Sequence, residues 1–271
     1  MSASRPSLWV LTVLVLCFLV APSLIIVPMS FSAGDYLQFP PQGLSLRWHA
    51  EVAQSPAWRD ALWVSVRVAV ANTAVSLALG IAAAYGLIHW RSRWRELVFG
   101  LLLTPMIFPV ILLAIGSFYI YAKLGLLDSI TGLVLAHSAL ALPVVLVMLT
   151  AALSNVDFNQ EKAARVLGAS RLQAFMHITL PQIRFALASA GLFAFLTSFD
   201  EVVVTLFISG GDATTLTKKM FTALRDVIDP TVAAISTWVL LFTCIALVAA
   251  QLLPQRGSRA GAPKAAQPET E

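Results

Sequence analysis

Six long apolar stretches constrain the fold of this chain more than any other feature of the sequence. They cover about residues 8–29, 61–89, 97–121, 130–153, 185–208 and 231–253. Each has at least the roughly 20 residues that an α-helix needs to cross a bilayer. Only helices and closed barrels can span a membrane, and barrel strands would alternate polar and apolar residues, which these stretches do not. The sequence therefore predicts an all-α integral membrane protein with six transmembrane helices in residues 1–253 and a disordered tail at 254–271.

The composition excludes several kinds of function. Of the 271 residues, 58% are hydrophobic and 12% are charged, about half the charged share of an ordinary soluble domain. The net charge of +4 suits contact with anionic membrane lipid, and no basic block is dense enough to follow a nucleic-acid backbone. The histidines lack the spacing of metal ligands, and the sequence has no GxxxxGKS/T phosphate loop. We therefore expect no catalytic residue, metal or cofactor in this chain, so that any ATP and Mg²⁺ would be bound by another one.

The longest polar stretch between two apolar ones, residues 154–184, predicts a helical hairpin. One capping-box pattern starts at Asp157 and a second starts at Ser170. Gly168 lies between them, where a left-handed residue would end the first helix. Pro181 is expected to close the second helix. The stretch is thus interpreted as two short helices joined at a glycine.

One face of the first predicted helix carries small residues. Ala163, Ala164 and Leu167 share that face, and Glu161 can pair with Arg165 one turn further on. Small side chains allow another protein surface to approach closely. We therefore expect the hairpin to fit into a socket on a partner protein.

The hairpin resembles the EAA loop of bacterial ABC importer permeases. The residues that stand at the family's intervals are Ala163, Ala164, Gly168, Ile178, Leu180 and Pro181. Lys162 occupies the position of the family's glutamate, and Glu161 stands one residue earlier. The resemblance implies a type I ABC importer permease, whose cytoplasmic coupling loop docks into a cleft on an ATPase subunit. The coupling residues that it implies are Glu161, Lys162, Ala163, Ala164, Leu167 and Gly168.

Two other interpretations of the hairpin stay open. Two short helices around a glycine also describe a DNA-binding helix-turn-helix. The apolar stretches on both sides oppose that interpretation, because they hold the loop at a membrane. The second alternative is a solvated structural loop.

The distribution of lysine and arginine predicts which side the hairpin faces. With six spans, both chain ends and the hairpin share one side, which carries 11 of the 18 basic residues against 6 on the other side. Arg67, near the outer end of the second span, completes the set. Cytoplasmic loops carry the excess of basic residues. We therefore expect a multi-pass protein of the bacterial inner (plasma) membrane with both termini and the hairpin in the cytoplasm.

The fifth apolar stretch contains Asp200 and Glu201, the only acidic pair within any of the six. A charged acid inside a span is costly and usually faces a cavity or a partner. We expect this pair, with Thr197 and Ser198, to line a substrate pathway, and a structural ion pair stays open as the alternative for the acids. Asn72 is expected to form a helix-to-helix hydrogen bond, and a place in the substrate pathway stays open as its alternative.

Three further sequence patterns lead to predictions about local structure. Pro105 and Pro109 predict a kink in the third apolar stretch. His137 in the fourth stretch could indicate a proton relay, but without an acid nearby we expect it to bond between helices. Residues 214–227 predict a short amphipathic helix at the outer membrane surface.

The residues and the resemblance together predict the permease subunit of an ATP-driven ABC importer. Residues 198–201 and 224–230 resemble the spermidine/putrescine group, most closely its second permease, which implies a polyamine substrate. Related groups carry opines, aminobutyrate, aminoethylphosphonate or ferric iron. The resemblance implies a second permease subunit or a copy of this chain, two ATPase subunits and an external solute-binding protein as partners.

Two functions of other classes stay open. An ion-coupled secondary transporter could use the acidic pair to carry a proton or a sodium ion. Such proteins commonly contain two inverted repeats, and 271 residues without a convincing repeat is short for that. A membrane scaffold without transport would leave the acidic pair without a role.

Overall fold

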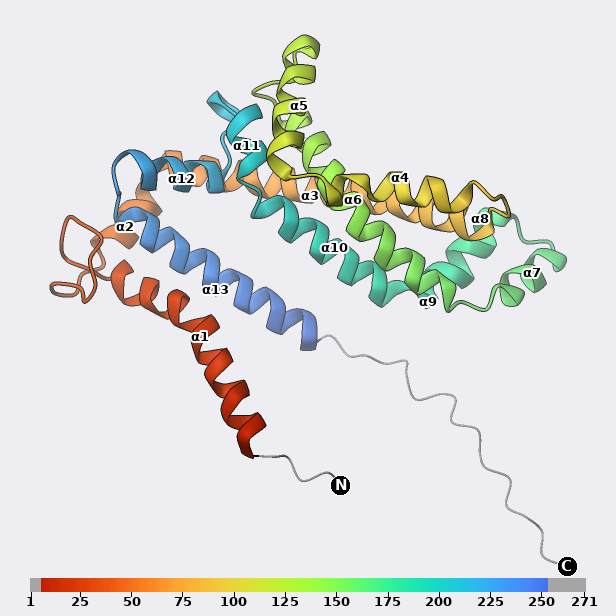
Figure 1. Cartoon of the computed structure of the whole chain (residues 1–271), viewed down its shortest axis with the longest axis horizontal. Helices are drawn as coiled ribbons and strands as arrows, with labels where there is room; N and C mark the ends of the chain where they lie inside the picture. Colours follow the sequence, from red (N-terminus) through yellow and green to blue (C-terminus); the bar gives the residue numbers. More distant parts are fainter. Residues whose placement is uncertain (1–5, 253–271) are drawn as a thin grey trace, which may run out of the picture. The chain divides into compact units, whose positions relative to one another are not determined.

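The computed structural model describes residues 6–252, which are mostly helical (Figure 1). Among these residues, β pairing is limited to one isolated bridge between Ser32 and Leu44. The chain divides into two compact units, one made of the residues up to Val52 and from Ile228 onward, the other of Ala53–Val227. The predicted tail at 254–271 lies outside the described residues.

The first unit contains α1 (Pro6–Ser30), α13 (Thr231–Leu252) and most of α2 (Arg47–Gln54), and α1 packs on α13. His49 of α2 joins the other two helices. The indole N–H of Trp238 donates to Nδ1 of His49 at 2.9 Å, and Nε2 of His49 lies 3.2 Å from Oγ of Ser30. Since an indole can only donate, the imidazole must accept at Nδ1. Burial lowers the pKa of His49, which favours the same neutral ring.

The second unit is built on three helices that pack together, α3 (Pro56–His89), α6 (Ile130–Ser154) and α10 (Arg184–Phe199). Leu149 and Leu153 of α6 are fully buried in the core between them. Gly80 lets α3 approach α6, because a Cβ atom there would lie 2.6 Å from Cγ1 of Val145. This contact fits the packing role that small residues have between membrane helices.

The third apolar stretch bends sharply at a proline. The helices α4 (Arg95–Ile107) and α5 (Val110–Leu124) meet at 97°. Pro109 has no N–H to continue the helix, and it forces the preceding Phe108 into an extended conformation with φ −75° and ψ 141°. The predicted kink is confirmed at Pro109, while Pro105 stays inside α4. The stretch 97–121 therefore contains parts of two helices that meet at the expected break.

The fifth apolar stretch is also interrupted, so the expected continuous helix over 185–208 is wrong. The helix α10 ends at Phe199, and α11 (Val203–Ile208) begins after a three-residue break that contains Asp200 and Glu201. The acidic pair therefore lies between two helices and not within one.

Four short helical pieces lie between α6 and α10. They are α7 (Phe158–Val166), α8 (Arg171–Ala174), the π-helix η1 (Phe175–Thr179) and α9 (Leu180–Gln182). Pro181 does not close this segment as expected, because it occupies the first turn of α9, where its missing N–H costs nothing. The chain turns at Ile183 instead, with a bend of 78° into α10.

Two more elements follow α11, the 3₁₀ turn η2 (Gly211–Ala213) and α12 (Leu216–Asp226), which matches the predicted amphipathic helix. Within the second unit they lie at the opposite end from α7 and α8 (Figure 1). In the described part of the chain, 3 helices are long and apolar enough to cross a membrane, or up to 5 spans if each bent pair counts as one. The number of six spans stays a prediction.

Candidate functional site

The hairpin between α6 and α10 has the turn that its sequence predicts. Gly168 has φ +97°, the left-handed conformation that ends the first helix. The N–H of Ala169 donates to the carbonyl of Ala164, and the N–H of Gly168 to that of Arg165, both at 3.1 Å. This pair of bonds is a Schellman motif.

The two predicted capping boxes have different outcomes. The box at Ser170 is confirmed, because Ser170 and Gln173 bond reciprocally at 3.2 Å and 2.8 Å. The box at Asp157 is wrong, since its carboxylate accepts from the N–H of Asn159 at 3.0 Å. The side chain of Asp157 still caps α7, but one residue earlier in the turn than a capping box would.

Glu161 points into the protein. Its side chain is 5% exposed, and the predicted pair with Arg165 does not form within the described residues. Oε1 accepts a hydrogen bond from the hydroxyl of Tyr85, and Oε2 accepts one from the hydroxyl of Thr179 at 2.7 Å. The carboxylate thus joins α7 to the end of α3 and to η1.

Aromatic rings surround this carboxylate. The ring of Tyr85 meets that of Phe175 edge-on at 4.9 Å between centroids, and His89 meets Phe158 at 4.7 Å. The guanidinium of Arg171 lies 5.5 Å from the centre of the Tyr85 ring. Such contacts add cation–π and edge-to-face stabilisation to the hydrogen bonds. The rings and the carboxylate together hold the hairpin against the last turn of α3.

The other face of the hairpin is uncovered in this chain. Leu167 is 89% exposed and Val166 87% exposed. Lys162 and Ala163 are exposed as well, and Ala164 is half-buried. Apolar residues with this exposure at a helix end are typical of a surface that a partner covers. The role of these residues in coupling stays a prediction.

The acidic pair shapes the break between α10 and α11. Oε1 of Glu201 accepts from the N–H of Val204 at 2.8 Å, and the carbonyl of Glu201 accepts from the hydroxyls of Thr205 and Thr217, both at 3.0 Å. Glu201 is half-buried, whereas Asp200 is exposed. The break therefore leaves one carboxylate free to face a solute.

A buried polar chain that the sequence did not predict supports this break. Nδ1 of His137 in α6 lies 2.8 Å from Oγ of Ser198, and Nε2 lies 3.2 Å from Oγ1 of Thr205. Since Thr205 donates its one proton to the carbonyl of Glu201, it must accept from Nε2–H, and Nδ1 must accept from Ser198. His137 thus links α6, α10 and α11, as its interpretation as a helix-to-helix bond expects.

None of the other predicted pathway residues is hydrogen-bonded directly to the carboxylates of the acidic pair among the described contacts. Asn72 is fully buried, donates to the carbonyl of Ala194 at 2.8 Å and accepts from the hydroxyl of Ser76 at 3.2 Å. Ser198 is buried against His137, and Thr197 is half-buried. Asn72 therefore forms the predicted bond between helices. Its contact with a substrate stays a prediction.

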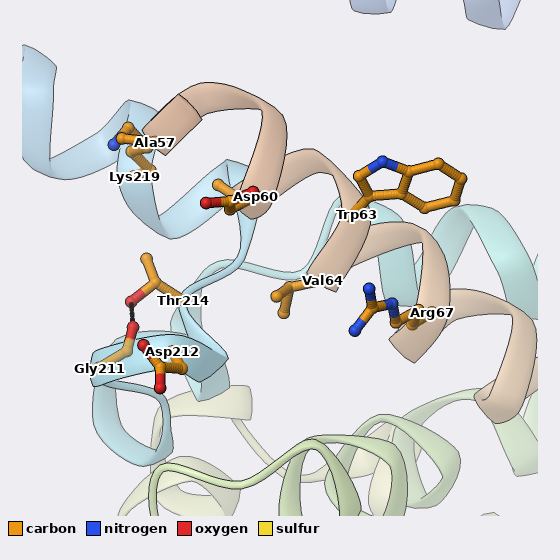
Figure 2. A pocket seen from close by; sticks show the side chains of 10 residues that line it. Ala57, Asp60, Trp63, Val64, Arg67, Gly211, Asp212, Thr214 and Lys219 are labelled. Carbon is orange, nitrogen blue, oxygen red and sulfur yellow. Dashed lines mark hydrogen bonds between the residues drawn. The ribbon is translucent and has the colours of Figure 1, made fainter. Parts of the chain in front are cut away.

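A cavity of about 480 Å³ opens at the other end of α3 from the hairpin. Asp60, Arg67 and Trp63 of α3 line it together with Asp212 of η2 and Lys219 of α12. Figure 2 shows Arg67 extending from α3 toward the cavity, with Asp212 on the opposite wall. In the part of the chain that the structure describes, Arg67 and Asp212 form no ion pair. The cavity thus offers groups of both charges.

Comparison with known proteins places these features in a family. The family model described as binding-protein-dependent transport system inner membrane component matches residues 76–259. The spermidine/putrescine transport system permease protein PotC of Escherichia coli (strain K12) is 27% identical, with 87% of this chain and 89% of that protein covered. The putrescine transport system permease protein PotI of the same strain is 30% identical, with 86% and 85% covered.

A solved structure supports the same fold. A bacterial ABC transporter involved in the import of the acidic polysaccharide alginate superposes with a TM-score of 0.69 at 17% identity, over 94% of this chain and 99% of that one. The chain belongs to the family of binding-protein-dependent inner membrane transport components and is a permease subunit of an ABC importer.

Proposed function

We propose that this chain carries polyamines, such as spermidine or putrescine, across the bacterial inner membrane. The observation that carries the proposal is the break between α10 and α11, which leaves Asp200 exposed beside Glu201. In a partly dry pathway a carboxylate attracts an ammonium group more strongly than it does in water. The similarity to polyamine permeases supports the same substrate.

The chain itself catalyses no covalent step. Two ATPase subunits bind ATP and Mg²⁺, a second permease or a copy of this chain completes the pathway, and an external solute-binding protein delivers the substrate. The hairpin face of Ala163, Ala164 and Leu167 docks on one ATPase. Closure of the ATPases moves the hairpin and shifts the spans between inward-open and outward-open states, because ATP stabilises one state more than the other.

Uptake by reconstituted vesicles tests the substrate. The assembled complex is supplied with ATP and with a solute-binding protein loaded with radiolabelled spermidine or putrescine. We expect uptake that stops without ATP. Uptake that follows a proton or sodium gradient without an ATPase would instead support the ion-coupled alternative.

The orientation proposed here is that both termini and the hairpin face the cytoplasm. Single cysteines at Gly168 and Asp212, in a chain lacking Cys17 and Cys244, report it through an impermeant thiol reagent in intact cells. We expect labelling at Asp212 alone. Labelling at Gly168 alone would reverse the orientation.

The cavity at the outer end of α3 favours a second candidate substrate. Its two carboxylates and two cations, on Asp60, Asp212, Arg67 and Lys219, match a solute that carries both charges, such as aminobutyrate, aminoethylphosphonate or an opine. A pure polycation would be repelled by Arg67. Competition by these solutes against polyamine uptake, measured with and without Arg67→Gln, separates the two candidates.

A further inference from the structure

We propose that Glu161 fastens the coupling hairpin to the inner end of α3, so that hairpin movement is transmitted along that helix. The proposal rests on the proposed coupling of the hairpin to an ATPase. Glu161 acts as a positioning residue, since it lies inside the protein and touches neither substrate nor ATP.

The direction of the side chain decides between a fastening role and a docking role. Adjacent residues on a helix point about 100° apart. Lys162 is exposed, whereas Glu161 is 5% exposed. Moving the acid from position 162 to position 161 therefore turns it from the outer face of α7 to the inner face, where a partner cannot reach it.

The bonding of the carboxylate is long-range. Tyr85 is 76 residues away in sequence and Thr179 is 18 residues away. Thr179 is fully buried, and Tyr85 is half-buried under the ring of Phe175. Removing these donors by substitution would leave the buried carboxylate desolvated and unpaired, which would weaken the attachment of the hairpin to α3.

The helix that receives the hairpin is long and continuous, which suits it to carry a movement. α3 runs unbroken for 34 residues, from Pro56 to His89, about 51 Å at 1.5 Å per residue. The α4–α5 and α10–α11 segments are interrupted. Its far end lines the cavity through Asp60 and Arg67. A displacement applied at Tyr85 therefore reaches the cavity through one rigid element.

The test removes the two hydroxyls without changing the size of either side chain. Tyr85→Phe and Thr179→Val are made singly and together, with Glu161→Gln as the conservative variant that keeps one accepting oxygen. Matched controls remove hydroxyls elsewhere. Tyr119→Phe alters a tyrosine that is 65% exposed, and Thr150→Val alters a buried hydroxyl that lacks a partner in the described residues.

Two measurements are made on the full permease in complex with its ATPase. The first is cross-linking of cysteines at His89 and Phe158, whose rings are in contact, by a short bismaleimide in a chain lacking Cys17 and Cys244. The second is substrate taken up per ATP hydrolysed. Since each hydrogen bond to a carboxylate shifts an equilibrium by about tenfold or more, we expect each single variant to lower both by about that factor and the double variant to lower both further. Glu161→Gln is expected to retain most of both, and the controls to match the parent.

Each outcome decides the proposal. Loss of cross-linking together with loss of coupling supports it. Unchanged cross-linking in the double variant, or lost cross-linking with unchanged coupling, overturns it. If the parent and the controls also fail to couple ATP hydrolysis to uptake while their cysteines cross-link normally, the proposed function fails and the attachment at Glu161 stands.

Discussion

Two glutamates, Glu161 within α7 and Glu201 in the break between α10 and α11, are held in opposite ways. Glu161 is almost fully buried and binds hydroxyls from two distant elements. Glu201 is half-buried and binds the N–H of Val204 within its own turn. The first therefore joins elements, while the second shapes a local turn beside the exposed Asp200. For a carboxylate, the hydrogen-bond partners, more than the degree of burial, therefore indicate whether the group stabilises the fold or faces a solute.

Neutralising the acidic pair is expected to have the largest effect on transport. In Asp200→Asn with Glu201→Gln, both carboxylates are removed while an accepting oxygen remains for Val204. We expect polyamine uptake to fall by about tenfold or more, because each hydrogen bond between an ammonium and a carboxylate contributes about 1.5–3 kcal/mol. Vesicle uptake measures it, with assembly and ATP hydrolysis as controls. Undiminished uptake would remove the contrast with Glu161, and failure to assemble would assign the pair a structural role.

Alanine substitutions at the two glutamates test the comparison between them through the stability of the folded permease. Glu161→Ala removes two long-range hydrogen bonds and is expected to lower the free energy of unfolding by about 3 kcal/mol. Glu201→Ala removes a bond like that of a helix cap, worth about 1 kcal/mol. Unfolding of the purified permease by titration with denaturing detergent compares them. Equal losses would contradict the distinction between fastening and local shaping.

The turn at Gly168 is expected to have a smaller effect. A β-branched side chain at φ +97° is disfavoured by about 1–2 kcal/mol. Gly168→Val should therefore leave the spans folded but lower the substrate carried per ATP hydrolysed, and Gly168→Asn, which tolerates this conformation better, is the matched control. If both variants couple like the parent, the turn geometry has no part in transmission.

The smallest effect is expected at Lys162. Its ammonium is exposed and bonds only to the side chain of Asn159, at 3.3 Å, among the described contacts. Lys162→Glu restores the charge that the family has at this position and should change coupling by less than about twofold, as for other exposed charges. A large loss in the same assay would show that the partner's surface has adapted to a cation here.

The local parts of this architecture were predictable from sequence, and the long-range parts were not. The conformations of Gly168 and Ser170 could be predicted, because a left-handed residue and a helix cap depend only on neighbours in the chain. The donors of Glu161 lie 76 and 18 residues away, so helical spacing suggested Arg165 instead. The break at Asp200 could likewise not be predicted from the run of apolar residues, since hydropathy indicates burial in lipid and not the continuity of a helix.

In the candidate pathway, too, the roles of single residues were predictable from the sequence, while their long-range partners were not. Asn72 and His137 were expected to bond between helices, yet neither of their partners, Ala194 and Thr205, follows from spacing along the chain. The link between His137 and the acidic break depends on how α6 packs against α10 and α11.

The central claim is that the exposed face of the hairpin docks on an ATPase while Glu161 holds its other face to α3. Leu167, which is 89% exposed, provides the most direct test. A cysteine at this position, in a chain lacking Cys17 and Cys244, is labelled with a benzophenone maleimide and photo-cross-linked in the purified complex. The account predicts a product that contains this chain and the ATPase, and no such product from a control cysteine at Asp212. Copurification of the ATPase without any cross-link at Leu167, or an equal cross-link at Asp212, would contradict it.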